Sequence, residues 1–128
     1  MVPALLPAYN VGPLLPAVLR ACAVLPELLV IDDGSSDGGP EIARTFSDPR
    51  FRLIRQENTG PAGARNRGIA ESSGEYVAFL DADDWYAPDR IKLHAEWVAE
   101  DPALDCLTGD YEYRDAAGGD RLVRETGT

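Results

Sequence analysis

The sequence predicts an α/β fold in which a mostly parallel sheet is covered by helices on both faces. Short apolar runs alternate with amphipathic segments of helical period along the chain. The most apolar runs end in acidic or polar clusters, as buried parallel strands do where they border a ligand crevice. Ten prolines and twelve glycines punctuate the chain and mark tight turns between short elements.

The first half of the chain begins with a short buried strand around residues 5 and 6. A helix should follow Pro13, because proline suits a first helical turn and apolar residues recur at helical spacing over residues 14–22. Residues 28–31 are apolar throughout and end at an acidic turn, which predicts a strand buried on both faces. Asp37 is then placed to cap a short helix.

The second half repeats this alternation. Residues 51–55 alternate in polarity and form a third strand, and the Thr-Gly-Pro sequence at 59–61 opens a helix. Residues 76–80 are an apolar fourth strand, and Pro88 starts the helix that follows it. Strands that alternate with helices imply βαβ units with right-handed crossovers. Further short strands are expected at residues 104–108 and 111–114, before a last apolar pair at 122–123.

Composition excludes several classes of function. The chain has 128 residues, with 12 basic and 22 acidic side chains and a net charge of −10, which fits one domain or part of one. This charge disfavours nucleic acid and anionic membrane surfaces as partners. No apolar run approaches the length of a transmembrane segment, and the start does not resemble a signal peptide. An anionic ligand such as a nucleotide would need a divalent cation to offset repulsion.

Polar sequences stand where three predicted strands end, at residues 7–10, 32–35 and 81–84. Because the carboxyl ends of parallel strands meet at one edge of a sheet, all three should face one crevice. A single aspartate after a strand is often only a helix cap, whereas clustered carboxylates need a cation or a ligand to offset their repulsion. Asp81 and Asp83 would point to the same side of an extended segment and suit Mg²⁺ or Mn²⁺.

Other acidic and phosphate-binding sites fit this sequence less well. An EF-hand requires Gly and Glu at the loop positions that Tyr86 and Lys92 occupy here. A receiver domain has a lysine after its fifth strand, but the only lysine of this sequence lies on a predicted helix. A haloacid-dehalogenase-type phosphatase carries its paired aspartates near the start of the chain. Neither a P-loop nor a Gly-rich dinucleotide motif is present.

A nucleotide-sugar site remains. Tyr9 offers a flat ring for a base, unless it is a packed aromatic residue. Asp33 could accept a hydrogen bond from a base imino group, or could instead cap the turn that follows it. Arg65 and Asn66 lie in the first turns of a helix, and a helix N-terminus with a guanidinium suits a diphosphate. A solvated helix face is the alternative for Arg65.

Four motifs in fixed order carry a resemblance to a known family. They are residues 7–10 (Pro-Ala-Tyr-Asn), 30–38, 58–68 and 74–85. Together they resemble the nucleotide-binding half of a family-2 glycosyltransferase over most of the chain. The resemblance implies a Rossmann-like GT-A fold for nucleotide-diphospho-sugar transferases. It also implies an inverting, metal-dependent transfer from a UDP-sugar to a saccharide or lipid-linked acceptor, in cell-wall or polysaccharide biosynthesis, in the cytoplasm or at the inner face of the membrane.

The resemblance also implies roles by position. Tyr9 and Asp33 would take the base, Arg65 and Asn66 would lie near the base and diphosphate, and Asp81 would lie on the ribose side. Asp83 would reach the metal, Mn²⁺ or Mg²⁺, with Asp84 beside it. The residues expected to contact the substrate are Pro7, Tyr9, Asp32, Asp33, Arg65, Asn66 and Asp81.

The family's catalytic base lies in an acceptor-binding half that follows the donor half. None of the acidic residues between Asp105 and Glu125 stands in a matching motif, so the base is expected beyond Thr128. Residues 1–128 are therefore interpreted as the nucleotide-sugar-binding portion of a single domain, with no transfer expected from the chain alone. The alternative is a fragment that holds nucleotide and metal without catalysis.

Overall fold

The computed structural model describes residues 4–8, 25–84, 86–87, 89–109, 111–114 and 120–123. The chain divides into two compact units, Met1–Ile91 and Lys92–Thr128. Each unit is considered by itself below. The helix predicted at residues 14–22 lies outside the described residues.

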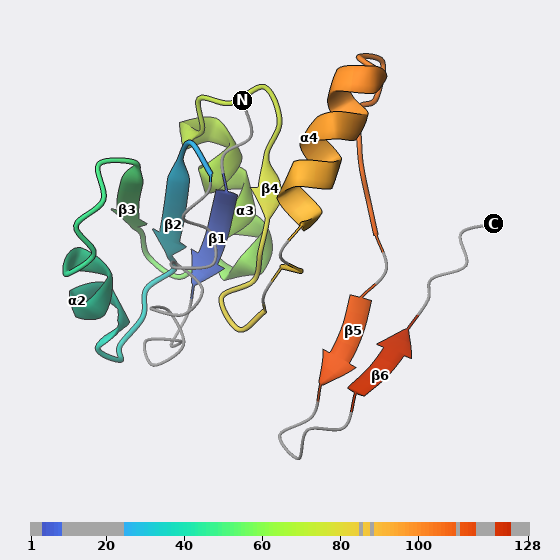
Figure 1. Ribbon diagram of the computed structural model, residues 1–128. Coiled ribbons are helices and arrows are strands. Elements are labelled where there is room, and N and C mark those ends of the chain that lie inside the picture. The colour runs from blue at the N-terminus through green and yellow to red at the C-terminus, as the bar shows by residue number, and fades with distance from the viewer. Residues whose placement is uncertain are drawn as a thin grey trace. The chain divides into compact units, whose positions relative to one another are not determined.

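A four-stranded parallel sheet forms the centre of the first unit (Figure 1). Its strands are β1 (Ala4–Ala8), β2 (Leu28–Asp32), β3 (Phe51–Arg55) and β4 (Ala78–Phe79), in the order β3-β2-β1-β4. The chain thus adds β2 and β3 on one side of β1 and then returns to place β4 on the other side. Ligands of open parallel sheets bind outside the carboxyl ends of the strands at such a reversal. A site is therefore expected outside the carboxyl ends of β1 and β4, which we call the β1–β4 edge.

The core lies on both faces of β2, as the sequence predicts. Leu28 and Val30 pack in one apolar cluster with Ala43 of helix α2 (Gly39–Arg44). Leu29 and Ile31 pack on the opposite face, in a cluster with helix α3 (Gly60–Glu71). All five residues of β2 are buried, because strands flank both of its edges and helices cover both of its faces. Each such aliphatic side chain stabilises the fold by about 1.5–3 kcal/mol.

Several predicted elements appear with the expected bounds, and others differ. Strand β3 has the predicted bounds, and α3 and α4 (Arg90–Glu100) begin within two residues of the expected positions. The fourth strand is shorter than residues 76–80, because it pairs only with β1, at two register positions. Residues 104–108 do not form the predicted strand, and no strand pairs with them in the described part of the chain.

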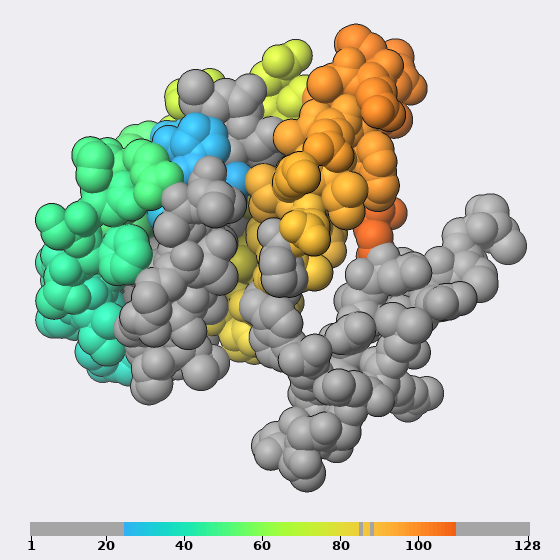
Figure 2. All heavy atoms as spheres, in the orientation of Figure 1, coloured from blue at the N-terminus to red at the C-terminus, as the bar shows by residue number. Residues whose placement is uncertain are grey.

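The second unit contains most of α4 and an antiparallel pair, β5 (Tyr111–Arg114) and β6 (Asp120–Val123). No residue of α4 is buried, and its side chains are visible at the surface in Figure 2. Among the helices that the structure describes, none combines the length and apolar character needed to cross a bilayer.

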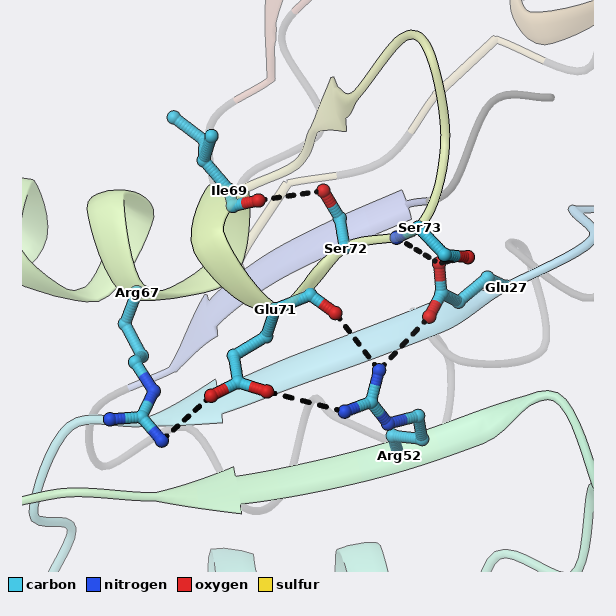
Figure 3. Close-up of polar contacts among 7 residues, drawn as sticks. All are labelled: Glu27, Arg52, Arg67, Ile69, Glu71, Ser72 and Ser73. Atoms are coloured by element: carbon cyan, nitrogen blue, oxygen red, sulfur yellow. Dashed lines mark hydrogen bonds and ion pairs between the residues drawn. The ribbon is translucent and has the colours of Figure 1, made fainter.

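An ionic network joins the amino ends of β2 and β3 to the end of α3 (Figure 3). Glu27, which is only 9% exposed, accepts hydrogen bonds from the Ser73 N–H at 3.2 Å and the Ser73 hydroxyl at 3.0 Å. It also pairs with Arg52 at 3.2 Å, and Arg52 donates to the Glu71 carbonyl at 3.0 Å. This network lies at the amino ends of the strands, whereas the site is expected at their carboxyl ends. We therefore infer that the network stabilises the fold.

Candidate functional site

Asp33 joins the carboxyl end of β2 to the start of α3. Its Oδ1 accepts hydrogen bonds from Gln56 Nε2 at 2.7 Å, the Thr59 N–H at 2.9 Å and the Thr59 hydroxyl at 3.2 Å. Its Oδ2 accepts the Gly60 N–H at 2.8 Å. Three donors thus converge on Oδ1 and one reaches Oδ2, so the carboxylate already accepts four hydrogen bonds. The side chain is 4% exposed, so its charge is held by the chain itself.

This arrangement changes the expected role of the α3 N-terminus. Asp33 takes the backbone N–H groups of Thr59 and Gly60, which stand at the helix start. It also places a negative charge there, so these two donors are not offered to a diphosphate. Burial by itself raises the pKa of Asp33, but the hydrogen bonds from Gln56, Thr59 and Gly60 outweigh it, and the pKa is lowered. Asp33 therefore stays ionised.

A close approach of two loops requires the glycine that follows Asp33. Gly34 has φ +81°, and a Cβ atom at this position would lie 3.0 Å from the backbone nitrogen of Asn58. The loop after β2 thus packs directly on the loop after β3. A similar restriction applies at Gly63, where a Cβ would collide with the Thr59 hydroxyl that serves Asp33.

Asp32 has the turn-capping role that the sequence had allowed for Asp33. Its Oδ1 accepts the Ser35 N–H at 2.9 Å within the turn after β2. Its Oδ2 is buried and lies 3.1 Å from Nε of Arg55, an ion-pair distance without hydrogen-bond geometry. Arg55 also donates to the Ser35 carbonyl at 3.0 Å. The side chain of Asp32 is 3% exposed, so in this arrangement it supports the loop rather than facing a ligand.

The acidic segment after β4 is a turn rather than the extended stretch expected from the sequence. The N–H of Asp84 donates to the carbonyl of Asp81 at 2.9 Å, which closes the turn. Ala82 is buried in the core beside Leu80, and this anchors the turn to the sheet. Asp83 and Asp84 are exposed. Burial raises the pKa of Asp84, and the charges of Asp83 and then Asp81 raise it further.

Arg65 connects α3 to this acidic turn. Its Nη2 donates to Oδ1 of Asp81 at 2.8 Å, although the two residues are sixteen positions apart. The two side chains are 40% and 47% exposed, so the pair lies at the surface of the sheet edge. Arg65 is thus placed beside the turn that follows β4.

The acidic turn fits a shared metal better than an all-protein metal site. In the part of the chain that the structure describes, no three His, Cys, Asp or Glu side chains are grouped to hold an ion by themselves. Mg²⁺ normally uses one or two protein carboxylates, and substrate phosphates and water complete its shell. Asp83 and Asp84 are two exposed carboxylates on one turn, and the pKa of Asp84 is raised first by burial and then by the charges of Asp83 and Asp81.

The structure brings some predicted site residues together and leaves others apart. Arg65 and Asp81 are in contact, and Asp83 and Asp84 belong to the same turn. Asn66 is exposed on α3, but it is rotated by about 100° around the helix axis from Arg65 and so lies on a different part of the helix surface. The remaining predicted contacts are Pro7, whose backbone lies in β1 opposite Ile31, and Tyr9, which lies outside the described residues.

Two residues of this edge were missed by sequence reasoning. The Gln56 amide donates to Asp33 and also to the Thr59 hydroxyl, both at 2.7 Å. Thr59 had been treated only as a helix opener. Gln56 directly follows β3, whose neighbour in the sheet is β2, so its position beside the end of β2 could have been inferred from strand adjacency.

Acid should destabilise the folded chain through groups whose pKa is lowered on folding. These are Asp33 and Glu27, where hydrogen bonds outweigh the raising effect of burial, and Asp48, where hydrogen bonds from Arg50 lower the pKa to about 2. Their stabilising effect is complete above the unfolded pKa values of about 4 and is lost as the pH falls through the folded values. Urea unfolding between about pH 7 and pH 2.5 should show falling stability below about pH 4. A flat profile over that range would contradict the assignment, and Glu27→Gln should reduce the slope.

The family model described as "Glycosyl transferase family 2" matches residues 4–125. The putative glycosyltransferase EpsH of Bacillus subtilis is 46% identical over 91 residues, covering 70% of this chain and 26% of that protein. The succinoglycan biosynthesis protein ExoO of Rhizobium meliloti is 45% identical over 71 residues, covering 55% and 20%. The structure of mannosyltransferase PcManGT from Pyrobaculum calidifontis, in complex with GDP-Man and Mn²⁺, has a TM-score of 0.72 and 30% identity, covering 80% and 33%. The chain thus spans about a third or less of each of these proteins.

Proposed function

The chain belongs to glycosyl transferase family 2 and has the GT-A fold, and from this premise we propose that it binds a nucleotide-diphosphate sugar at the β1–β4 edge. The observation that carries the proposal is the contact of Arg65 with the acidic turn at this edge. The Arg65 guanidinium can bind a diphosphate, and one or two carboxylates of the turn can hold a divalent metal whose shell the phosphates complete. The activity proposed for the protein is sugar transfer from a UDP-sugar to a saccharide hydroxyl.

Each residue of the edge has a role in this proposal. Asp83 and Asp84 would hold Mn²⁺ or Mg²⁺, and Asp81 would lie on the ribose side. The cation, when bound, would neutralise charge that develops on the departing diphosphate. Arg65 would orient the same diphosphate by charge-assisted hydrogen bonds. Asp33 fixes the start of α3 and so the position of Arg65, and it would accept the base imino N–H in exchange for the Gln56 amide.

Two relatives support the substrate class. The mannosyltransferase from Pyrobaculum calidifontis was solved with GDP-Man and Mn²⁺, which supports a nucleotide-diphosphate sugar and a divalent metal. ExoO is named for succinoglycan biosynthesis, which supports a saccharide acceptor. Inversion would require one displacement at the anomeric carbon. The acceptor oxygen forms the new bond, the diphosphate leaves with the old bonding pair, and a base takes the acceptor proton. We assign no residue of this chain to that base.

A preference for uridine diphosphate tests the base site. Uracil has an imino N–H that Asp33 can accept in place of the Gln56 amide, whereas adenine has no imino donor. We expect calorimetry in Mn²⁺ to show UDP binding about tenfold or more tighter than ADP, the effect of a hydrogen bond to a charged group. The matched control is N3-methyl-UDP, in which a methyl group replaces the imino hydrogen. Equal affinity for UDP and its N3-methyl analogue would contradict the role of Asp33 at the base.

A further inference from the structure

Arg65 lies between two anionic groups that it cannot serve at once. We propose that it is an exchangeable partner of Asp81. In the free chain Arg65 pairs with Asp81, and on donor binding it moves to the diphosphate, which releases the Asp81 carboxylate and restores the full negative charge of the turn that attracts the divalent cation. This inference rests on the proposed function, because it takes the diphosphate and the cation as ligands of this edge.

The contact between the two side chains has the properties of an exchangeable pair. Arg65 Nη2 and Asp81 Oδ1 are 2.8 Å apart. Among the ion pairs of the described residues, this is the one that involves the turn at residues 81–84. Both side chains are close to half exposed, at 40% and 47%. Ion pairs of such exposure contribute little stability, so another anion can displace Asp81 from Arg65 at low cost in free energy. Asp32 and Arg55 form a contrasting pair, in which the carboxylate is 3% exposed.

The surroundings of Asp81 explain why its release matters. Asp81 and Asp84 close one turn through a backbone hydrogen bond of 2.9 Å, and Asp83 lies between them. Three carboxylates on four residues repel one another, and the only positive charge that the described ion pairs place on them is Arg65. When Arg65 leaves, the negative charge of the turn is no longer offset, and the attraction for a divalent cation increases.

Exchange makes the binding of metal and of donor mutually dependent. The free chain holds Mn²⁺ weakly, because Arg65 both occupies Asp81 and repels the ion. The diphosphate removes Arg65 from Asp81 and so strengthens metal binding. By linkage, the metal must strengthen diphosphate binding by the same factor. The chain would thus favour binding the donor and its metal together.

The test measures Mn²⁺ binding to the free 128-residue chain, by calorimetry or by the loss of the free-ion spin-resonance signal. Arg65→Met should bind Mn²⁺ about two- to fivefold more tightly than the parent chain, which is the effect of releasing a half-exposed ion pair. The strengthening of Mn²⁺ binding by UDP should fall by about the same factor, because Asp81 is already available in the variant. Arg65→Lys retains the charge and should behave like the parent chain.

Two further variants separate exchange from a general change in charge. Arg67→Met removes the same charge from the same helix, at a side chain that is 50% exposed and pairs with Glu71 at 2.8 Å. It should leave Mn²⁺ affinity unchanged. In an Asp81→Asn background, Arg65→Met should lose its effect, since the carboxylate that Arg65 releases is absent. Thermal unfolding of each variant checks that it is folded.

The outcomes distinguish this inference from the proposed function. If the parent chain binds UDP with Mn²⁺ but Arg65→Met binds Mn²⁺ no more tightly, exchange is overturned and the proposed function stands. The same conclusion follows if Arg65→Met has its full effect in the Asp81→Asn background. If the parent chain binds neither UDP nor Mn²⁺, the proposed function fails and the exchange fails with it.

Discussion

Asp83→Ala is expected to remove most of the effect of Mn²⁺ on the binding of a nucleoside diphosphate. The loss of a charge-assisted contact costs about 1.5–3 kcal/mol, so diphosphate affinity in Mn²⁺ should fall roughly 10- to 150-fold. Affinity measured without metal should change little or improve, because one negative charge near the phosphates is removed. Calorimetric titration of UDP in Mn²⁺ and in a chelator gives both numbers.

The geometry of the acidic turn supports this choice of residue. Asp81 is engaged by Arg65 at 2.8 Å, whereas the carboxylate of Asp83 is exposed and has no ion pair among the described residues, so it is open to a ligand. The charge of Asp83 also contributes, after burial, to the raised pKa of Asp84. In Asp83→Ala the pKa of Asp84 should therefore move back toward its ordinary value, and the remaining carboxylate would be a single ligand for the cation.

A matched control is available at the other end of the same strand. Glu75 is exposed and precedes β4, so it lies toward the amino end, whereas Asp83 follows the carboxyl end. Glu75→Ala removes one negative charge and should leave both affinities unchanged. If Asp83→Ala and the parent chain bind UDP equally well in Mn²⁺, or if Glu75→Ala loses as much affinity, the metal role of Asp83 is wrong.

The central strands and the acidic clusters could be predicted from the sequence because local pattern determines them. Residues 28–31 are apolar without interruption, and a strand with neighbours on both edges and both faces requires this. The Thr-Gly-Pro sequence of residues 59–61 correctly located the start of α3. The prediction of an extended segment at residues 81–84 was wrong, because spacing alone does not distinguish an extended segment from a turn closed by one backbone hydrogen bond.

The partners of the site side chains could not be predicted, since they join segments distant in sequence. Asp33 receives donors from residues 23 to 27 positions away, and Arg65 meets Asp81 across sixteen positions. As partners of Asp33, sequence reasoning considered a base imino group and the local turn, and not these distant segments of the chain. The length of the fourth strand was likewise unpredictable, because an apolar run continues whether or not a second strand pairs with it.

Asp33→Ala is expected to lower the free energy of unfolding by about 2–4 kcal/mol, because each buried polar group left without a partner costs about 1–3 kcal/mol. The replacement removes the acceptor for Gln56, for two backbone N–H groups and for the Thr59 hydroxyl at once. Water can rehydrate part of this set, since Thr59 is exposed, and this keeps the expected loss below the sum of its parts. Urea unfolding at about pH 7, where Asp33 is ionised, measures the change.

Two companion variants determine whether the loss belongs to this junction. Asp33→Asn keeps the shape of the side chain, but its amide NH₂ would face an N–H group that Asp33 now accepts. We therefore expect Asp33→Asn to recover less than half of the stability that Asp33→Ala loses. Asp37→Ala, which removes the acceptor of the Gly39 N–H at the start of α2, should cost only about 1 kcal/mol, as loss of one hydrogen bond does. If Asp33→Ala costs no more than Asp37→Ala, Asp33 does not hold α3 to the sheet. Arg65 would then be positioned by the packing of α3 on β1 and β2 rather than by this carboxylate.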